Sequence, residues 1–207
     1  MSTDVDIVVV YHSGFGHTAA QARAVGEGIL RVDGARAQMV FTEDAASQLD
    51  RLTAADALVF GAPTYMGSAS AAFKQFMDAT SSMWLRQGWK DKLAAGFTNS
   101  GGHSGDKLNT LVQMMLFAMQ HGMVWVGLGL PDGNNSAASS HENVNRLGAY
   151  AGAMAQSNVD QGLEGMLPSD LETAALLGER VARSARRWVA ARARDGALHA
   201  ETLEPRA

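Results

Sequence analysis

An apolar strand that runs into a loop rich in glycine and hydroxyl groups, and then directly into a helix, is the feature that most constrains this chain. Residues 6–11 predict a short strand that is rich in β-branched residues, and residues 18–31 predict a helix with one apolar stripe. The loop between them reads His-Ser-Gly-Phe-Gly-His-Thr, from His12 to Thr18. Unpaired N–H groups and the positive end of the helix dipole favour an anion at such a helix start. No lysine or arginine lies in this loop, so it would hold a phosphate by dipoles and hydrogen bonds, without a formal countercharge.

The sequence of this loop is compatible with more than one kind of phosphate site. It lacks the Gly-Lys-Ser/Thr ending of a Walker A loop. It matches the short pattern Gly-x-Gly-x-x-Ala through Gly14, Gly16 and Ala19, which dinucleotide-binding folds also contain. Ser13 and Thr18 place hydroxyl groups at both ends of the loop, which suits a terminal monophosphate better than a pyrophosphate. We therefore favour flavin mononucleotide (FMN), with a dinucleotide and an ordinary polar turn as the alternatives.

Strands and helices alternate along the rest of the chain. Further strands are predicted at residues 37–41, 57–61, 93–98 and 123–128, and helices at 70–80, 107–120 and from 168 onward. This alternation predicts an α/β fold with a five-stranded parallel sheet covered on both faces, in the flavodoxin-like strand order 2-1-3-4-5. Residues 131–145 are rich in Asn, Ser, Gly and Asp and predict an insertion after or within the fifth strand, with another short extended segment at 150–155. In the last helix, Ser169 and Glu172 have capping-box spacing.

Two more loops follow buried strands at the same sheet edge, where ligands bind in folds of this type. In residues 61–68, Pro63 biases the residue before it toward an extended conformation. Residues 64–67 can then present backbone N–H groups and an aromatic ring to a flat heterocycle. Residues 98–106 contain three glycines within five positions, which permits close backbone approach. Each loop alone is compatible with a simple turn, but the three together indicate a ligand site.

Composition narrows the classes of function. The chain has 207 residues, of which 46% are hydrophobic, and this fits one flavodoxin-like domain over residues 1–195 with a disordered tail at 196–207. The net charge of −4 gives no reason to expect nucleic acid or an anionic membrane as a partner. The lack of cysteine excludes disulfides, thiolate catalysis and iron–sulfur clusters, and the histidine spacing predicts no metal site. With no signal-peptide pattern and no apolar run of ~18 residues, a cytoplasmic protein is expected.

Five segments, taken in their order and spacing, are similar to a known family. They are His-Ser-Gly-Phe-Gly-His-Thr (12–18), Gly-Ala-Pro-Thr-Tyr-Met-Gly (61–67), Phe-Met-Asp-Ala-Thr-Ser-Ser-Met-Trp-Leu (76–85), Lys-Leu-Ala-Ala-Gly-Phe-Thr-Asn-Ser-Gly-Gly (92–102) and His-Gly-Met-Val-Trp-Val-Gly (121–127). Through them the chain resembles the WrbA family of flavodoxin-like NAD(P)H:quinone oxidoreductases. The resemblance implies FMN as the cofactor, NAD(P)H and a quinone as substrates, and two-electron reduction by ping-pong hydride transfer. It also implies a homo-oligomer, either a dimer or a tetramer.

The same resemblance assigns roles to residues, with the chemistry carried by the cofactor and no essential catalytic side chain. It implies that residues 13–18 hold the FMN phosphate, that residues 64–66 line the isoalloxazine, and that residues 99–104 wrap its other side and the ribityl chain. The cofactor-binding set is Ser13, Gly14, Phe15, Gly16, His17, Thr18, Pro63, Thr64, Tyr65, Met66, Asn99, Ser100, Gly101, Gly102, His103 and Ser104. The substrate set is Phe15, Trp84, Gln120 and His121. The chain has Gln120-His121 where the family often has His-His, and Tyr65-Met66 where it often has Arg-Phe, so its substrate preference is open.

Functions of other classes are also compatible with parts of the sequence. A flavodoxin that carries electrons usually has an acidic rim around the flavin, whereas residues 62–69 and 99–105 contain no Asp or Glu. A signalling receiver domain of the same topology needs an acidic pair after the first strand, where this chain has His12 and Ser13. An FMN-binding module without turnover is the alternative that the sequence leaves open beside the electron carrier.

Overall fold

The sheet has the parallel order that the sequence predicts. The computed structural model describes residues 4–202, with side chains as far as residue 193. Its strands are β1 (Val5–Tyr11), β2 (Ala35–Phe41), β3 (Ala57–Tyr65), β4 (Ser68–Ala69), β5 (Leu93–Ser100), β6 (Val124–Trp125) and β7 (Ala153–Gln156). The order across the sheet is β2-β1-β3-β5-β6, with β7 also paired to β5, and all of these pairs are parallel. The flavodoxin-like fold is thereby confirmed, and β4 adds a short antiparallel hairpin to β3.

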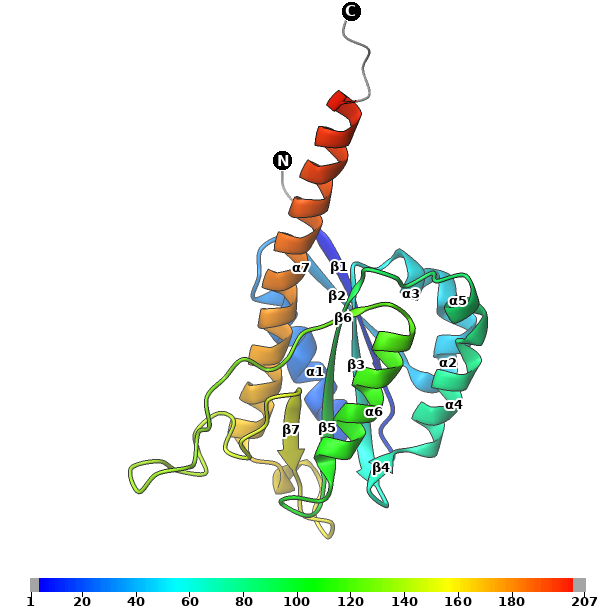
Figure 1. Ribbon diagram of the computed structural model, residues 1–207. Helices are drawn as coiled ribbons and strands as arrows, with labels where there is room; N and C mark the ends of the chain where they lie inside the picture. Colours follow the sequence, from blue (N-terminus) through cyan, green and yellow to red (C-terminus); the bar gives the residue numbers. More distant parts are fainter. Residues whose placement is uncertain (1–3, 203–207) are drawn as a thin grey trace, which may run out of the picture.

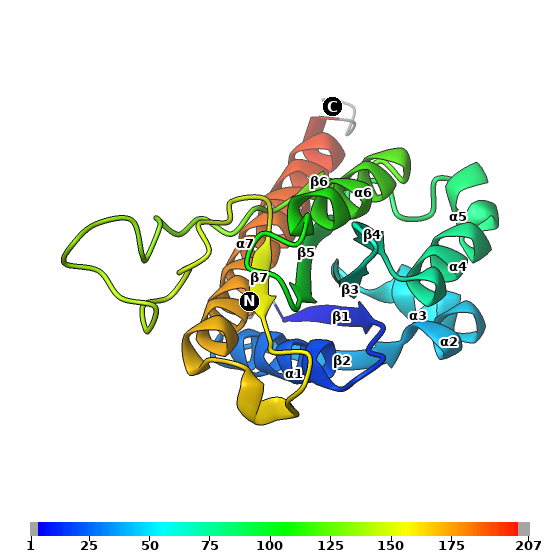
Figure 2. The same cartoon turned by 90° about the horizontal axis from the view of Figure 1, so that it is seen from below.

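The insertion divides the fifth strand into two pieces. β6 pairs with the first two residues of β5, and β7 pairs with its last four. The chain leaves the sheet after Trp125 and returns at Ala153, so the strand expected at 123–128 is shorter than predicted. Figures 1 and 2 show the intervening segment as a long excursion that projects away from the sheet on the side of the last helix. Of the two places predicted for the insertion, the structure has the one within the strand.

Helices cover both faces of the sheet (Figure 2). The helices are α1 (His17–Leu30), α2 (Thr42–Ala45), α3 (Leu49–Ala54), α4 (Ala71–Ala79), α5 (Ser81–Leu85), α6 (Lys107–Gln120) and α7 (Pro168–Thr202), with short 3-10 turns η1 (Ala46–Gln48) and η2 (Leu163–Gly165). One apolar core lies between one face of the sheet and the helices α1 and α7. The other core lies between the opposite face and the helices α4 and α6. The short α2, α3 and α5 were not predicted, because a helix of four to six residues carries too little periodicity to read.

β1 shows how the sequence produces this three-layer arrangement. Ile7 and Val9 belong to the core under α1 and α7, whereas Val8 and Val10 belong to the core under α4 and α6. Successive side chains of a strand point to opposite faces, so a strand covered on both sides must be apolar throughout. The apolar strand ends at Tyr11, and the loop that begins at His12 lies at the carboxyl edge of the sheet.

α1 and α7 approach each other closely through two glycines. A Cβ atom on Gly28 would lie 1.8 Å from the Ala175 carbonyl oxygen, and one on Gly178 would lie 2.1 Å from the Val25 carbonyl oxygen. Only glycine permits backbones to come this near. The contact fixes α1 against the long α7 and so positions the start of α1 at the carboxyl edge of the sheet.

The last helix is longer than the sequence predicted. Its backbone stays helical to Thr202, so residues 196–202 are helical where a disordered tail was expected. Alanine, leucine and glutamate in this stretch favour a helix, and Pro205 follows it. Residues 203–207, the rest of the expected tail, lie outside the described residues. Among the helices described between residues 4 and 202, none has the length and hydropathy needed to cross a membrane.

Candidate functional site

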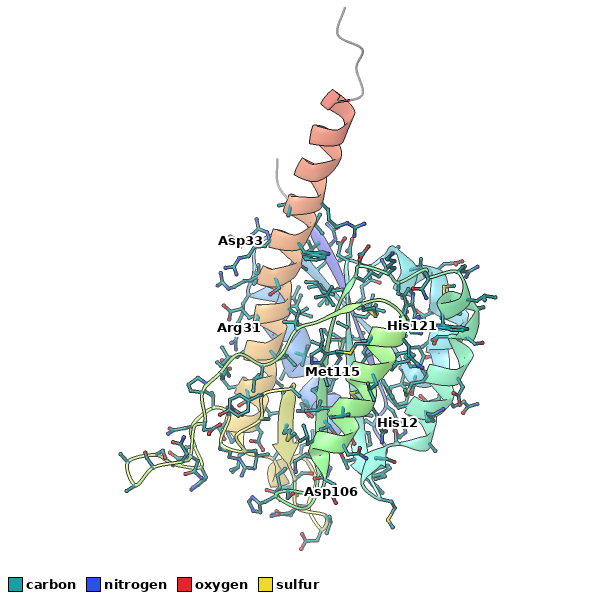
Figure 3. The ribbon with its side chains drawn as sticks, in the orientation of Figure 1. His12, Arg31, Asp33, Asp106, Met115 and His121 are labelled. Carbon is teal, nitrogen blue, oxygen red and sulfur yellow. The ribbon has the colours of Figure 1, made fainter. Side chains whose placement is uncertain are left out.

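The loops at the carboxyl ends of the strands enclose a cavity of about 670 Å³. This volume lies within the range of small-molecule and cofactor sites. The cavity is lined by Ser13, Phe15, His17, Thr18, Pro63, Thr64, Tyr65, Met66, Asn99, Ser100, Gly101, Ser157, Val159 and Gln161. Eleven of the sixteen residues that the sequence assigned to a cofactor therefore line a single cavity. In Figure 3, His12 and Asp106 mark this edge of the sheet from two of its loops.

Ser13 organises the start of α1. Its Oγ accepts hydrogen bonds from the N–H groups of Gly16 and Ala19, both at 3.1 Å. Gly16 is the residue before the helix and has a φ of 90°, a conformation that favours glycine. The N–H groups of His17 and Thr18 lie in the first turn, where no intrahelical acceptor exists. They are available to an anion at the end of the cavity lined by Ser13, His17 and Thr18, together with the dipole of α1.

A segment that the sequence did not single out closes this end of the cavity. Residues 157–165 follow β7 and contribute Ser157, Val159 and Gln161 to the lining. The imidazole Nε2 of His17 lies 2.9 Å from the Gly162 carbonyl oxygen, which attaches the segment to α1. Ligands bind at the carboxyl ends of strands in folds of this type. The extended segment predicted at 150–155 is therefore the sequence signal for this loop, because the loop follows it directly.

The inner wall carries buried polar groups with one unmet hydrogen bond. Thr64 Oγ1 lies 2.8 Å from both Thr98 Oγ1 and Thr110 Oγ1. Asn99 donates from Nδ2 to Ser157 Oγ at 2.8 Å, but its Oδ1 is buried and has no partner among the described residues. An unpaired buried acceptor costs about 1–3 kcal/mol, so a ligand with an N–H or O–H donor would fit at this wall.

Aromatic and apolar side chains form the rim of the cavity. Phe15 is 80% exposed and Met66 is fully exposed, while Tyr65 packs edge-on against Phe15 with ring centroids 6.4 Å apart. Burial raises the pKa of the Tyr65 phenol, whose hydroxyl lies against Gly14. Met66 and Gly67 both have positive φ, 49° and 78°, and form the tip of the β3–β4 hairpin. The rim is thus suited to contact with a flat or apolar molecule.

The cavity lining has no Asp, Glu, Lys or Arg. A lysine that sequence reasoning missed lies directly behind it. The side chain of Lys107 is fully buried, and its Nζ donates to Ser100 Oγ at 2.8 Å and to the Gly102 carbonyl oxygen at 2.6 Å. Burial lowers its pKa to about 8. Its position at the first turn of an amphipathic helix gave no signal of burial.

The other predicted residues lie outside the cavity lining. Gly14, Gly16 and Gly102 shape the loops, whereas His103 and Ser104 line a neighbouring groove together with Lys107. Trp84 is half exposed on α5, and Gln120 is exposed at the far end of α6, roughly 20 Å along the helix from Lys107.

His121 lies in the core near that far end (Figure 3). It is hydrogen-bonded to Thr80 Oγ1 at 2.9 Å, and its ring centroid is 4.5 Å from that of Trp89. Burial lowers its pKa to about 4. Within this one chain, Trp84, Gln120 and His121 are therefore not brought to the cavity.

Comparisons with known proteins agree with this geometry. Residues 17–131 match the family described as NADPH-dependent FMN reductase. The chain is 45% identical over 180 residues to flavodoxin FldP of Pseudomonas aeruginosa, which covers 85% of this chain and 94% of that protein. It is 32% identical over 146 residues to an NAD(P)H dehydrogenase (quinone) of Geobacter sulfurreducens, covering 60% and 72% of the two chains.

A solved structure gives the same result. The crystal structure of a flavodoxin, WrbA-like protein from Agrobacterium tumefaciens has a TM-score of 0.70 and 41% identity, and covers 89% of this chain and 99% of its own. The family match spans more than half of the chain, and the relatives align over most of their lengths. The resemblance to the WrbA family is thereby confirmed. The chain therefore belongs to the flavodoxin-like family of NADPH-dependent FMN reductases and WrbA-like proteins.

Proposed function

We propose that the protein is an FMN-dependent NAD(P)H:quinone oxidoreductase. Membership of an FMN family gives the cofactor, and oxidoreductase chemistry is the family's general activity. The observation that carries the finer proposal is the cavity itself, which combines a neutral, hydrogen-bonding interior with an exposed apolar rim at Phe15 and Met66. Such a rim suits the nicotinamide ring and a quinone, both of which are flat.

The residues of the cavity would hold FMN in three parts. Ser13 to Thr18 would hold the phosphate through hydroxyl and backbone donors, and residues 63–66 would border the isoalloxazine. Residues 99–104 would follow its other side and the ribityl chain, with Asn99 Oδ1 accepting a donor from the cofactor. His17 would keep the segment 157–165 in place over the phosphate, through its contact with the Gly162 carbonyl oxygen.

The protein supplies binding and orientation, and leaves the chemistry to the cofactor. When bound, FMN accepts two electrons and a proton as hydride from NAD(P)H and passes them on to an acceptor. Phe15 and Tyr65 would orient the flat substrates beside the cofactor. Because Tyr65 is neutral and no carboxylate or ammonium group lines the cavity, the side chains add no charge to the reacting surface.

We further propose a homo-oligomer, a dimer or tetramer, in the cytoplasm. The outer face of α6 exposes Leu108, Leu116 and Met119, an apolar stripe typical of a subunit contact. Trp84 and Gln120 are exposed and lie outside the cavity of their own chain, so a role at the quinone site would require contact with a neighbouring copy. Light scattering of the purified protein would test this, and a monomer at all concentrations would remove both residues from the substrate site.

One observation favours a second function. The relative FldP, at 45% identity, is named a flavodoxin, so an electron carrier or an FMN-binding module without turnover is the competing function. Against the carrier, residues 62–69 and 99–105 contain no Asp or Glu, although the segment 157–165 adds two exposed carboxylates, Asp160 and Glu164.

Anaerobic stopped-flow absorbance separates these functions. FMN-loaded protein is mixed with NADH or NADPH, and then with benzoquinone. We expect rapid loss of the visible flavin absorbance and full recovery on addition of the quinone. Tight FMN binding with no loss of absorbance on mixing with either nicotinamide would overturn the proposal and favour the carrier or the binding module.

A further inference from the structure

Lys107 is a buried cation one hydrogen bond away from the cavity wall. Its side chain is inaccessible to solvent, and its Nζ donates to Ser100 Oγ at 2.8 Å. Ser100 in turn lines the cavity. Burying an ammonium group is costly unless an anion or a set of dipoles compensates it. The two oxygens that Lys107 contacts, Ser100 Oγ and the Gly102 carbonyl, are both neutral.

The carboxylate that acts electrostatically on Lys107, that of Asp170, is already paired. Asp170 accepts hydrogen bonds from Arg146 Nε at 2.8 Å and Nη2 at 2.7 Å, and from the Gln156 N–H at 2.9 Å. Arg146 and Asp170 are both buried, and they act on Lys107 in opposite directions. Within the part of the chain that the structure describes, Lys107 forms no ion pair. This buried cluster of two cations and one anion therefore has one positive charge in excess.

The position of this charge points to the ring and ribityl chain of the cofactor and not to its phosphate. The phosphate loop follows β1, whereas Ser100 ends β5, and β3 lies between these two strands. Two strand spacings separate the loops by roughly 10 Å across the sheet. A ligand whose phosphate lies at Ser13 and Thr18 would reach Ser100 with its ribityl chain or ring.

We propose that Lys107 stabilises the reduced form of the bound flavin by placing a positive charge behind the Ser100 wall. The inference rests on the flavin site proposed above, but not on the identity of the electron donor or acceptor. Transfer of a hydride from NAD(P)H to oxidised FMN adds two electrons and one proton and yields NAD(P)⁺, so the ring gains one negative charge. A buried cation near the ring stabilises the negatively charged reduced form, whereas it has little effect on the neutral oxidised ring. Lys107 is thus a positioning and electrostatic residue that contacts the cofactor through Ser100.

The experiment measures the two-electron midpoint potential of FMN-loaded protein by anaerobic reductive titration against a reference dye. Lys107→Met removes the charge and keeps the length of the side chain. We expect the affinity for reduced relative to oxidised FMN to fall roughly 10- to 100-fold, as for removal of a charge at short range. That change corresponds to a potential about 30–60 mV lower for a two-electron couple. Lys107→Arg keeps the charge and should retain the potential of the unmodified protein.

Lys92→Met is the matched control. Lys92 is half-buried, its Nζ contacts the Ala55 carbonyl oxygen, and it lies just before the opposite end of β5. The substitution Lys92→Met removes one lysine charge far from the cavity, so the midpoint potential of the bound FMN should stay unchanged. If Lys107→Met does not fold, Lys107→Gln removes the charge while keeping a donor for the Gly102 carbonyl oxygen, and the same shift is expected.

Two outcomes would overturn the inference. An unchanged potential in a folded Lys107→Met or Lys107→Gln protein would show that the lysine only supports the loop. A loss of affinity for FMN but not for riboflavin, at unchanged potential, would show that the charge acts on the phosphate. Because the titration uses a chemical reductant, these results do not depend on turnover with NAD(P)H or quinone. Failure of the reductase proposal would therefore be recognised separately.

Discussion

His17 Nε2 lies 2.9 Å from the carbonyl oxygen of Gly162, and this contact joins the first residue of α1 to the segment after β7. The two residues are far apart in the sequence, yet His17 lines the cavity and Gly162 directly follows Gln161, which lines it as well. The Leu163 side chain also lies near Gly16, so the segment rests on the phosphate loop. Release of the segment would open this end of the cavity to solvent.

Replacing His17 with Leu should loosen the segment 157–165 without unfolding the sheet. The Gly162 carbonyl loses its partner, so amides 158–165 should exchange hydrogen faster, and the affinity for FMN should fall roughly tenfold, the equivalent of about 1.4 kcal/mol. Hydrogen exchange by mass spectrometry and an FMN titration would measure both. His12→Gln is the control, since His12 lies in the same loop near Glu43 and not on the segment. Unchanged exchange in His17→Leu would contradict the contact.

Replacing Ser13 with Ala should weaken both the helix start and the phosphate site. The N–H groups of Gly16 and Ala19 lose their acceptor, which should cost about 1 kcal/mol of unfolding free energy, as for other helix caps. FMN affinity should fall more than riboflavin affinity, because only FMN has the phosphate. Ser47→Ala, an exposed serine on η1, is the control for a lost hydroxyl. Equal losses for FMN and riboflavin would place the phosphate elsewhere.

The fold and most of the site were predictable because the signals are local. A strand whose central residues are all apolar, such as Ile7–Val10 of β1, indicates a sheet covered on both faces, and a glycine-rich turn before a helix indicates an anion site. Parallel strands carry their following loops to one edge, so Ser13, Thr64 and Asn99 were expected together and do line the same cavity. The strand order came from matching alternating strands and helices to a known topology, and the strand ends were predicted less well, since β3 continues to Tyr65 and β5 to Ser100.

What sequence reasoning missed depends on partners that are distant in the chain. The fifth strand is split because its two halves pair with different ends of β5, which no local pattern reveals. The capping box expected at Ser169 is absent, since Ser169 lies inside α7 and its Oγ donates to the His141 carbonyl oxygen. Glu172 instead pairs with Arg31. The burial of Lys107 likewise depends on the loop after β5, where its Nζ contacts Ser100 and Gly102.

Gly28→Ala should destabilise the protein, whereas Gly26→Ala should stabilise it. A Cβ on Gly28 would overlap the Ala175 carbonyl oxygen, and neither backbone can move, so a loss of about 2–3 kcal/mol is expected. A Cβ on Gly26 would lie 3.4 Å from the flexible Met39 Sδ, and the better helix propensity of alanine should add about 0.5–1 kcal/mol. Urea unfolding of both variants measures the difference. A similar change in both would show that α1 and α7 are not in close contact.

Stability should fall as the pH is lowered from about 6.5 to about 4, and His121 should account for part of the loss. Burial lowers the pKa of His121 from 6.5 to about 4 in the folded protein, so the unfolded chain binds more protons throughout that window. Each pKa unit corresponds to about 1.4 kcal/mol, which gives on the order of 3 kcal/mol at most. Unfolding free energies at several pH values should show a shallower slope for His121→Asn than for the exposed control His141→Asn. Equal slopes would mean that His121 is protonated in the fold.

Met66→Asn should raise stability and impair the use of quinone. Met66 and Gly67 both have positive φ, as a type I′ turn requires, and Asn-Gly is the preferred pair there, so a gain of about 0.5–1 kcal/mol is expected. The fully exposed Met66 is part of the apolar rim, and an amide in its place should raise the KM for benzoquinone a few-fold. FMN affinity should change little, because asparagine keeps the backbone groups that residue 66 offers to the isoalloxazine. Leu30→Asn makes a comparable exposed change at the far end of α1 and should not alter the KM. A more stable Met66→Asn protein with an unchanged KM would assign Met66 to the turn alone and remove it from the acceptor site.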